Sequence, residues 1–345
     1  MVFNGTGAQS IPSVTYNNLE TGTAGTKTLS GGITVNGSLT IGNSTTLDAG
    51  SYTHNLAGNF TNNGTFSAGT STFNFNGSSN QQISGSSSFY HLTVNNSNEV
   101  VLNSNVTTDG TLTLTNGRFN INGKTLRLNG SFSGSTSNSL IGSAASNLTI
   151  GFSYAGGTLY FDQTSASSNN CIKTFTVHSD VSLGNKLNIT AGNAPGTVDV
   201  SAGTTLYTND SLHLQSDIAG TARIGELPVN GAGAATAYIN GKVTIERYIP
   251  AARGWRFLSV PVKSTNAPTI NEAWQEGLTT ASSNPNLYPG YGVKICGGNS
   301  VHGFDTSATI NSFIKTFNST TNSFTSLPSN PGTYIPITNY PAYFL

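Results

Sequence analysis

Apolar and polar residues alternate along the segment from Phe75 to Phe132. In four places two apolar residues flank one polar residue: Leu92/Val94, Leu112/Leu114, Phe119/Ile121 and Leu126/Leu128. A period of two is typical of β-strands with one buried face. Most runs are short and end in Asn, Gly, Ser or Asp, which favour turns. Strand starts near positions 92, 100, 106, 112, 119 and 126 predict a new strand every six to eight residues.

The same segment recurs along the chain. Phe3-Asn4-Gly5 falls on Phe75-Asn76-Gly77, and Gln9-Ser10-Ile11 falls on Gln81-Gln82-Ile83, at an offset of 72 residues. A third, weaker copy begins near Phe161. Long repeats of many short strands indicate a chain that stacks on itself.

Three strands at this spacing make a coil of about twenty residues, the size of one turn of a three-sided β-solenoid. We therefore predict an all-β protein containing a right-handed parallel β-solenoid (β-helix), with three or four turns in each repeat. An antiparallel sandwich also has short alternating strands, but it does not naturally give copies related by translation. The frequent Asn-Gly steps are the expected bends between sides, and Gly123 is expected to adopt a positive φ there.

The pattern changes after Asp217. We predict solenoid repeats over residues 1–217, with copies starting near 3, 75 and 161, and a Gly- and Ala-rich connection over 218–237. Residues 238–345 are predicted to form a smaller β-rich globular domain, truncated at its C-terminus. Its helix is expected from Ile270 to Glu276, with a capping box of Thr269 and Glu272 and with Trp274 facing a core.

Composition limits the classes of partner. Charged residues make up 8% of the 345-residue chain, and its 14 basic and 14 acidic residues cancel. The absence of a basic run argues against nucleic acid as a partner, and no apolar run approaches the ~20 residues of a membrane span. Met1 leads directly into repeat sequence and the chain ends on an apolar run, so we expect a fragment of a larger protein.

One resemblance is specific enough to name. The runs GKVTIERYIPAARGWRFLSVPV (Gly241–Val262), INEAWQEG (Ile270–Gly277) and PGYGVKI (Pro289–Ile295) resemble a module of very large cell-surface proteins of the Bacteroidetes. Proteins of this kind are adhesin-like and are exported by the type IX secretion system. The resemblance implies an extracellular, cell-surface stalk or adhesin, with the export machinery as a partner in transit and extracellular glycans or other cells as further partners. It supplies no catalytic residues.

Two other functions stay open. Parallel β-helices also serve as polysaccharide lyases and hydrolases, which need paired carboxylates. The solenoid's acidic residues occur singly, and Asp48 and Asp109 sit at predicted turns. A glycan-binding module would instead present exposed aromatic rings, for which Tyr288 and Tyr291 are candidates. His and Cys residues lack metal-ligand spacing, so neither a metal site nor a cofactor is expected.

A few residues are singled out as candidate sites. Asp210-Ser211-Leu212 matches the short pattern at which exported Bacteroidetes proteins are O-glycosylated, so Ser211 is a candidate for modification, with a plain surface serine as the alternative. Arg253, Trp255 and Arg256 form a candidate ligand-binding or packing cluster. The pairing of Cys171 with Cys296 is left open.

Overall fold

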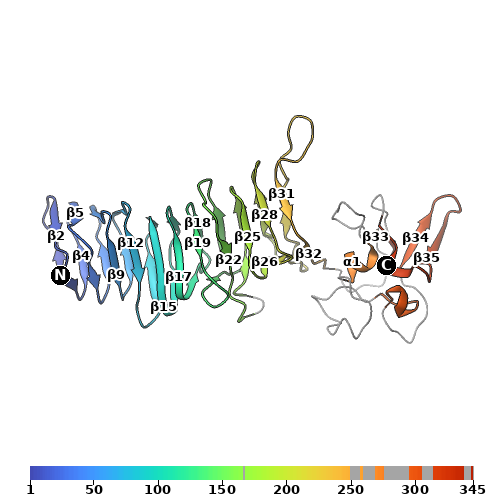
Figure 1. Cartoon of the computed structure of the whole chain (residues 1–345), viewed down its shortest axis with the longest axis horizontal. Coiled ribbons are helices and arrows are strands. Elements are labelled where there is room, and N and C mark those ends of the chain that lie inside the picture. Colours follow the sequence, from blue (N-terminus) through green and yellow to red (C-terminus); the bar gives the residue numbers. More distant parts are fainter. Residues whose placement is uncertain are drawn as a thin grey trace. The chain divides into compact units, whose positions relative to one another are not determined.

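The computed structural model describes residues 1–165, 168–248, 257–258, 269–275, 295–304, 314–337 and 343–344. The chain divides into two compact units, Met1–Ile249 and Pro250–Leu345. The first unit is a parallel β-solenoid of about ten turns (Figure 1). The all-β class and the solenoid predicted from the sequence are therefore confirmed.

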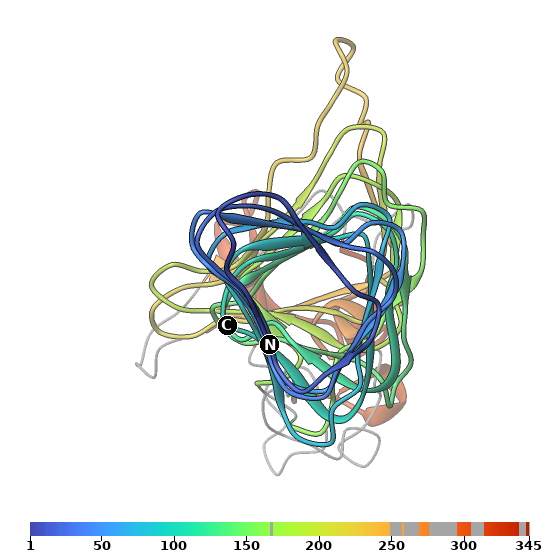
Figure 2. The ribbon, with the colours of Figure 1, turned by 90° about the vertical axis from the view of Figure 1, so that its left-hand side faces the viewer.

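Each turn of the solenoid contributes strands to three sides, and strands pair in parallel with their counterparts in neighbouring turns. Figure 2 looks along the stack and shows the turns superposed around a common centre. The first side contains β1 (Val2–Phe3), β4 (Leu19–Thr21), β7 (Leu39–Ile41), β10 (Phe60–Asn62), β13 (Gln81–Ser84), the later parts of β15 (His91–Leu102) and β17 (Leu112–Asn120), β20 (Leu140–Ile141), β23 (Cys171–Ile172), β26 (Leu187–Ile189), β29 (Leu212–Leu214) and β32 (Val243–Ile245).

The other two sides are built in the same way. The second side contains β2 (Gln9–Ile11), β5 (Gly25–Leu29), β8 (Thr45–Asp48), β11 (Thr65–Ser67), β14 (Ser87–Phe89), β16 (Val106–Thr108), β18 (Thr125–Leu128), β21 (Asn147–Ile150), β24 (Thr174–Val177), β27 (Thr197–Val200) and β30 (Arg223–Ile224). The third side contains β3 (Thr15–Tyr16), β6 (Thr34–Val35), β9 (Thr53–Leu56), β12 (Thr72–Phe75), the first parts of β15 and β17, β19 (Phe132–Ser133), β22 (Thr158–Leu159), β25 (Val181–Leu183), β28 (Thr205–Tyr207) and β31 (Tyr238–Asn240).

The length of a turn follows from the register. Leu39 pairs with Leu19 and with Phe60, so one turn takes 20 or 21 residues there. This agrees with the coil of about twenty residues expected from the strand spacing. Later turns are longer because loops are inserted at the corners: Leu206 pairs with Ile239, 33 residues on, and the extra residues form the loop before β31 that stands out in Figure 1.

Two pairs of predicted strands are continuous in the structure. The strands expected to start near 92 and 100 are both parts of β15, and those near 112 and 119 are both parts of β17. β15 turns the corner between the third and first sides within one strand, and its register with β17 shifts between Val94 and Glu99. Such an irregularity bends a strand without ending its pairing.

The core consists of the inward residue of each alternating pair, stacked turn upon turn. Leu39, Phe60 and Ile83 lie in register and are fully buried. Each such side chain contributes roughly 1.5–3 kcal/mol relative to an exposed one. A low-hydrophobicity chain can therefore fold, because each turn buries the inward face of the next.

Outward polar residues form ladders, as expected. Asn74 pairs with Asn55 and donates to its side-chain oxygen at 2.9 Å. The hydroxyls of Thr111 and Ser131 are 2.9 Å apart on the same side. Stacking identical or similar polar groups satisfies them without charge.

The 72-residue repeat does not coincide with a structural layer. Phe3 lies in β1 on the first side, whereas Phe75 lies in β12 on the third. Gln9 lies in β2 on the second side and Gln81 in β13 on the first. The offset therefore spans three full turns and two further sides. The unit that stacks is the single turn, and the longer sequence period is carried around the solenoid axis.

The Asn-Gly steps are bends, but only some use a positive φ. Gly123 has φ +71° and Gly117 has φ +93°, as predicted for such bends. At Gly130 the reason for glycine is different: a Cβ there would overlap the carbonyl oxygen of Gly110 in the turn before. Close stacking of turns therefore requires glycine where φ alone does not.

The predicted boundary at Asp217 is too early. β30, β31 and β32 pair in parallel with β27, β28 and β29, so the stacking continues to Ile245. The Gly- and Ala-rich stretch expected as a connection holds β30 and the corner loop before β31. Loop residues mask the short strands between them, which explains why the pattern seemed to end.

The second unit is described only in part. Its strands β33 (Phe257–Leu258), β36 (Tyr343–Phe344), β34 (Lys315–Asn318) and β35 (Ser323–Ser326) form an antiparallel sheet in that order. Helix α1 (Ile270–Trp274) confirms the predicted helix start, and Trp274 packs against a cluster that includes Ile270 and Phe304. The 3₁₀ helices are η1 (Ser300–His302) and η2 (Gly332–Tyr334).

Candidate functional site

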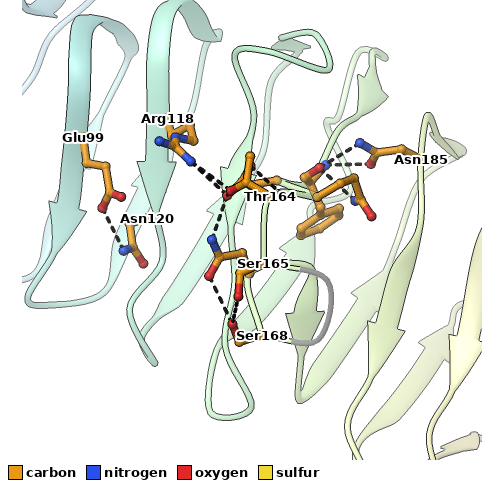
Figure 3. Close-up of polar contacts among 11 residues, drawn as sticks. Glu99, Arg118, Asn120, Thr164, Ser165, Ser168 and Asn185 are labelled. Atoms are coloured by element: carbon orange, nitrogen blue, oxygen red, sulfur yellow. Dashed lines mark hydrogen bonds and ion pairs between the residues drawn. The ribbon is translucent and has the colours of Figure 1, made fainter.

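The most connected polar cluster of the described solenoid lies on its first side (Figure 3). Arg118 is near the end of β17, and its Nη1 atom lies 3.0 Å from Oδ2 of Asp162. Phe119 pairs with Leu140, and Leu140 bridges Phe161, so the ion pair reaches across the intervening turn. The Asp162 side chain is 4% exposed, which makes this a largely desolvated contact at its acidic end.

Asp162 holds the start of a corner loop. Its carboxylate accepts hydrogen bonds from the Thr164 hydroxyl at 2.7 Å, the Thr164 N–H at 3.2 Å and the Asn169 amide at 2.7 Å. Burial by itself would raise the pKa of Asp162, but these hydrogen bonds and the one from Arg118 outweigh it and lower the pKa below its usual range. The carboxylate is therefore ionised at neutral pH.

The neighbouring residue Phe161 is fixed through its backbone. Its N–H donates to Asn185 Oδ1 at 2.8 Å, and its carbonyl accepts from Asn185 Nδ2 at 2.7 Å. Gln163 Nε2 donates to the same carbonyl at 2.9 Å. These contacts join three turns, so the cluster ties the loop to the stack on both sides.

Glu99 is the second acid of the cluster. It lies in register with Arg118, and its Oε2 accepts from Asn120 Nδ2 at 3.1 Å. General acid–base hydrolysis uses one carboxyl whose pKa is raised so that it can donate a proton. Asp162 has a lowered pKa and is neutralised by Arg118, so its chemistry suits holding the loop.

Sequence reasoning treated Asp162 as an isolated acid. Arg118 and Asp162 are 44 residues apart, and their meeting depends on the register of two successive turns and on the loop between them. Neither is visible as a motif. The signal that bears on it is the turn length, which places position 118 above positions near 139 and 160.

The two turn aspartates behave as predicted. Asp48 Oδ1 accepts the N–H of Gly50 at 3.1 Å, an Asx-type turn. Asp109 Oδ1 accepts from Asn129 Nδ2 at 2.7 Å at a corner. Both are bound to backbone or amide groups.

The histidines occupy strand and corner positions. His91 and His178 are half-buried, as expected for residues that flank strands. His54 is buried; its Nε2 lies 2.9 Å from the Ala49 carbonyl oxygen, and burial lowers its pKa although that hydrogen bond opposes the shift. Among the described residues, no group of three or more His, Cys, Asp and Glu side chains is arranged to hold a metal ion.

The remaining candidate residues divide into those placed and those outside the described ranges. Ser211 is half-buried, and its hydroxyl donates to the Asn209 carbonyl at 3.1 Å. Arg253, Trp255, Arg256 and the tyrosines at 288 and 291 lie outside the described residues. Cys171 and Cys296 are both buried, and Asn188 Nδ2 lies 3.8 Å from Cys171 Sγ.

Comparison with known proteins adds no assignment. No protein-family model, no curated protein and no solved structure matches the chain. Among the helices that the structure describes, none is both long enough and apolar enough to cross a membrane. The functional argument therefore rests on the fold and on the side chains described above.

Proposed function

We propose that this chain is a non-enzymatic stalk segment of a larger extracellular cell-surface protein, and that the protein serves adhesion. The observation that carries the proposal is the uninterrupted parallel stacking from β1 to β32. Each added turn lengthens such a stack by one strand spacing, about 4.8 Å, while contacting only its neighbours. An assembly of this kind gives reach and stiffness with little sequence constraint.

The surface chemistry fits a stalk exposed to changing salt. Among the described residues the one ion pair is Arg118–Asp162, and the outward ladders are built from Thr, Asn and Ser. Salt screens interactions between exposed charges and leaves neutral hydrogen bonds largely unaffected. The stack is therefore held by contacts that ionic strength barely changes.

The export route in this proposal is the type IX secretion system, and it is supported by the resemblance of Gly241–Gly277 to modules of exported Bacteroidetes proteins. Ser211 is the proposed site of O-glycosylation in the native host. The segment from Thr208 to Leu212 is a tight turn followed by a strand, and the neighbouring Asp210 is exposed. The intact mass of host-derived protein, compared with a Ser211→Ala variant, tests this modification.

Surface labelling tests the proposed function directly. Antibodies raised against the solenoid should label intact cells of the source organism, and deletion of the gene should reduce attachment to surfaces or to other cells. A strain lacking type IX secretion should lose the label. Labelling that requires cell lysis, or depolymerisation of a polysaccharide by the purified full-length protein, would contradict the proposal.

A further inference from the structure

One corner of the solenoid, between its second and third sides, carries aromatic and polar side chains in successive turns. The residue that follows each second-side strand lies above its counterpart in the turn before, because each N–H bonds to the preceding turn. This column contains Tyr90, Asp109, Asn129, Gly151 and His178. We call it, together with Arg127 and Phe152, the corner site.

Phe152 is the most unusual residue of the corner site. Its side chain is 72% exposed, and its ring stacks on His178 with centroids 4.2 Å apart and planes 17° from parallel. His178 is itself held by Ser201, whose hydroxyl lies 2.6 Å from Nδ1. The arrangement holds an apolar ring in water with one face covered and the rest open, although a lone exposed Phe is usually mobile.

Polar groups beside the ring are fixed by a chain of hydrogen bonds. Arg127 Nε donates to Asn129 Oδ1 at 2.8 Å, and Asn129 Nδ2 donates to Asp109 Oδ1 at 2.7 Å. Asn129 lies directly below Gly151, the residue that precedes Phe152, because a Cβ on Gly151 would overlap its side-chain oxygen. The amide, the carboxylate and the guanidinium are thus pre-oriented next to the exposed ring.

Arg127 carries the positive charge of the corner. Burial lowers the pKa of His178, and the nearby Arg127 lowers it further, so His178 is neutral at pH 7. Within the described part of the chain, Arg127 makes no ion pair with a carboxylate. Its Nε is engaged by Asn129, which leaves the forked end of the guanidinium for an anion.

We propose that the corner site binds an acidic polysaccharide of the uronate class. The apolar face of one sugar ring lies on Phe152, the uronate carboxylate pairs with Arg127, and sugar hydroxyls bond to Asn129 and Asp109. Tyr90 stands three strand spacings from the Phe152 turn, about 14 Å. That distance suits a second contact with the same short stretch of polymer.

The chemistry selects this ligand over its alternatives. A neutral glycan would use Phe152 and the amide but would leave Arg127 without an anion. A protein partner would require a larger apolar surface than one exposed ring. The inference deepens the adhesive role proposed above, but binding in solution does not depend on where the cell places the protein.

The test uses the full chain and two defined polymers, polygalacturonate as the acidic probe and dextran as the neutral one. Affinity electrophoresis or calorimetry should show binding to polygalacturonate and at least about tenfold weaker binding to dextran. Phe152→Ala and Arg127→Gln should each weaken polygalacturonate binding by about tenfold or more. Both side chains are at the surface, so circular dichroism should show the fold unchanged.

Two matched variants complete the design. Tyr52→Ala removes another exposed aromatic ring, and Arg223→Gln removes another exposed cation of the second side; neither should change binding. Equal binding of both polymers, absence of polygalacturonate binding, or an equal effect of the control variants would overturn the proposal. Loss of surface labelling in cells with intact polygalacturonate binding would instead contradict only the proposed function.

Discussion

Gln9 and Gln81 play the same structural role in two copies of one sequence motif. The side-chain oxygen of Gln9 accepts the N–H of Gly5 at 2.9 Å, and that of Gln81 accepts the N–H of Gly77 at 2.8 Å. The motif Phe-Asn-Gly followed by Gln thus closes a turn through its own side chain. The 72-residue sequence repeat preserves this device, even though the two copies lie on different sides of the solenoid.

Gln81 should be among the most important polar residues of the stack. It is 1% exposed, and its Nε2 donates to the carbonyls of Leu56 at 2.8 Å and Gly58 at 2.6 Å. Gln81→Ala would leave several buried groups without partners, at about 1–3 kcal/mol each. We expect a clear loss of stability in thermal melts and faster amide exchange in the turns around β13. Gln82→Ala, at the exposed neighbouring position, should change neither; equal effects would refute this role.

Two histidines should make the solenoid sensitive to acid. Burial lowers the pKa of His54 below 6.5, and burial together with Lys186 lowers that of His213 to about 4. The unfolded chain therefore binds protons first as the pH falls. The stability is complete above about pH 6.5 and is lost between pH 6.5 and about 4. Melting temperatures should fall across this window, and less so in His213→Gln; an identical pH profile for that variant would contradict the assignment.

Gly130 and Gly123 separate two reasons for glycine. An alanine at Gly123 meets ordinary contacts, with Ala145 at 3.4 Å, and suffers only from its positive φ, at about 1–2 kcal/mol. An alanine at Gly130 would overlap the Gly110 carbonyl and push two turns apart. We expect Gly130→Ala to lower the melting temperature more than Gly123→Ala. The reverse order would show that turn spacing is less tight than described.

The Asp162 cluster should control the corner loop that follows it. Asp162→Asn removes the ion pair with Arg118 and weakens the bonds to Thr164 and Asn169, at a cost of about 1–3 kcal/mol. We expect faster limited proteolysis within residues 163–170. Glu99→Gln, which changes the acid on the other side of Arg118, serves as the matched control. Equal cleavage of the native chain and of Asp162→Asn would argue against this role.

The sequence predicted the fold because its signals are local. Alternation at Leu112 and Leu114, turn residues between strands and a strand every six to eight residues are enough to define a coil of about twenty. The inward positions of the predicted pairs are buried in the structure. Strand identity and turn length therefore followed from residues close together in the chain.

What the sequence did not predict depends on register across turns. Lys27 sits at an inward position with no exposed surface, and its ammonium donates to the carbonyls of Gly5, Gly7 and Ala24 at 2.6–2.8 Å. No local pattern announces those acceptors. The late end of the solenoid was missed for a related reason, since β30 and β31 are two and three residues long and are separated by a loop.

The central claim, that the first unit is one stack of coils, is tested most directly by distances between outward positions in successive turns. Ser88, Thr149, Thr176 and Asp199 lie in one column of the second side. Spin labels on Ser88 paired with Thr149, Thr176 or Asp199 span three, four or five strand spacings, about 14, 19 and 24 Å between backbones. Pulsed electron paramagnetic resonance should give distances that rise by about 5 Å per turn. Distances without that regular increment, as hairpin pairing would produce, would contradict the account.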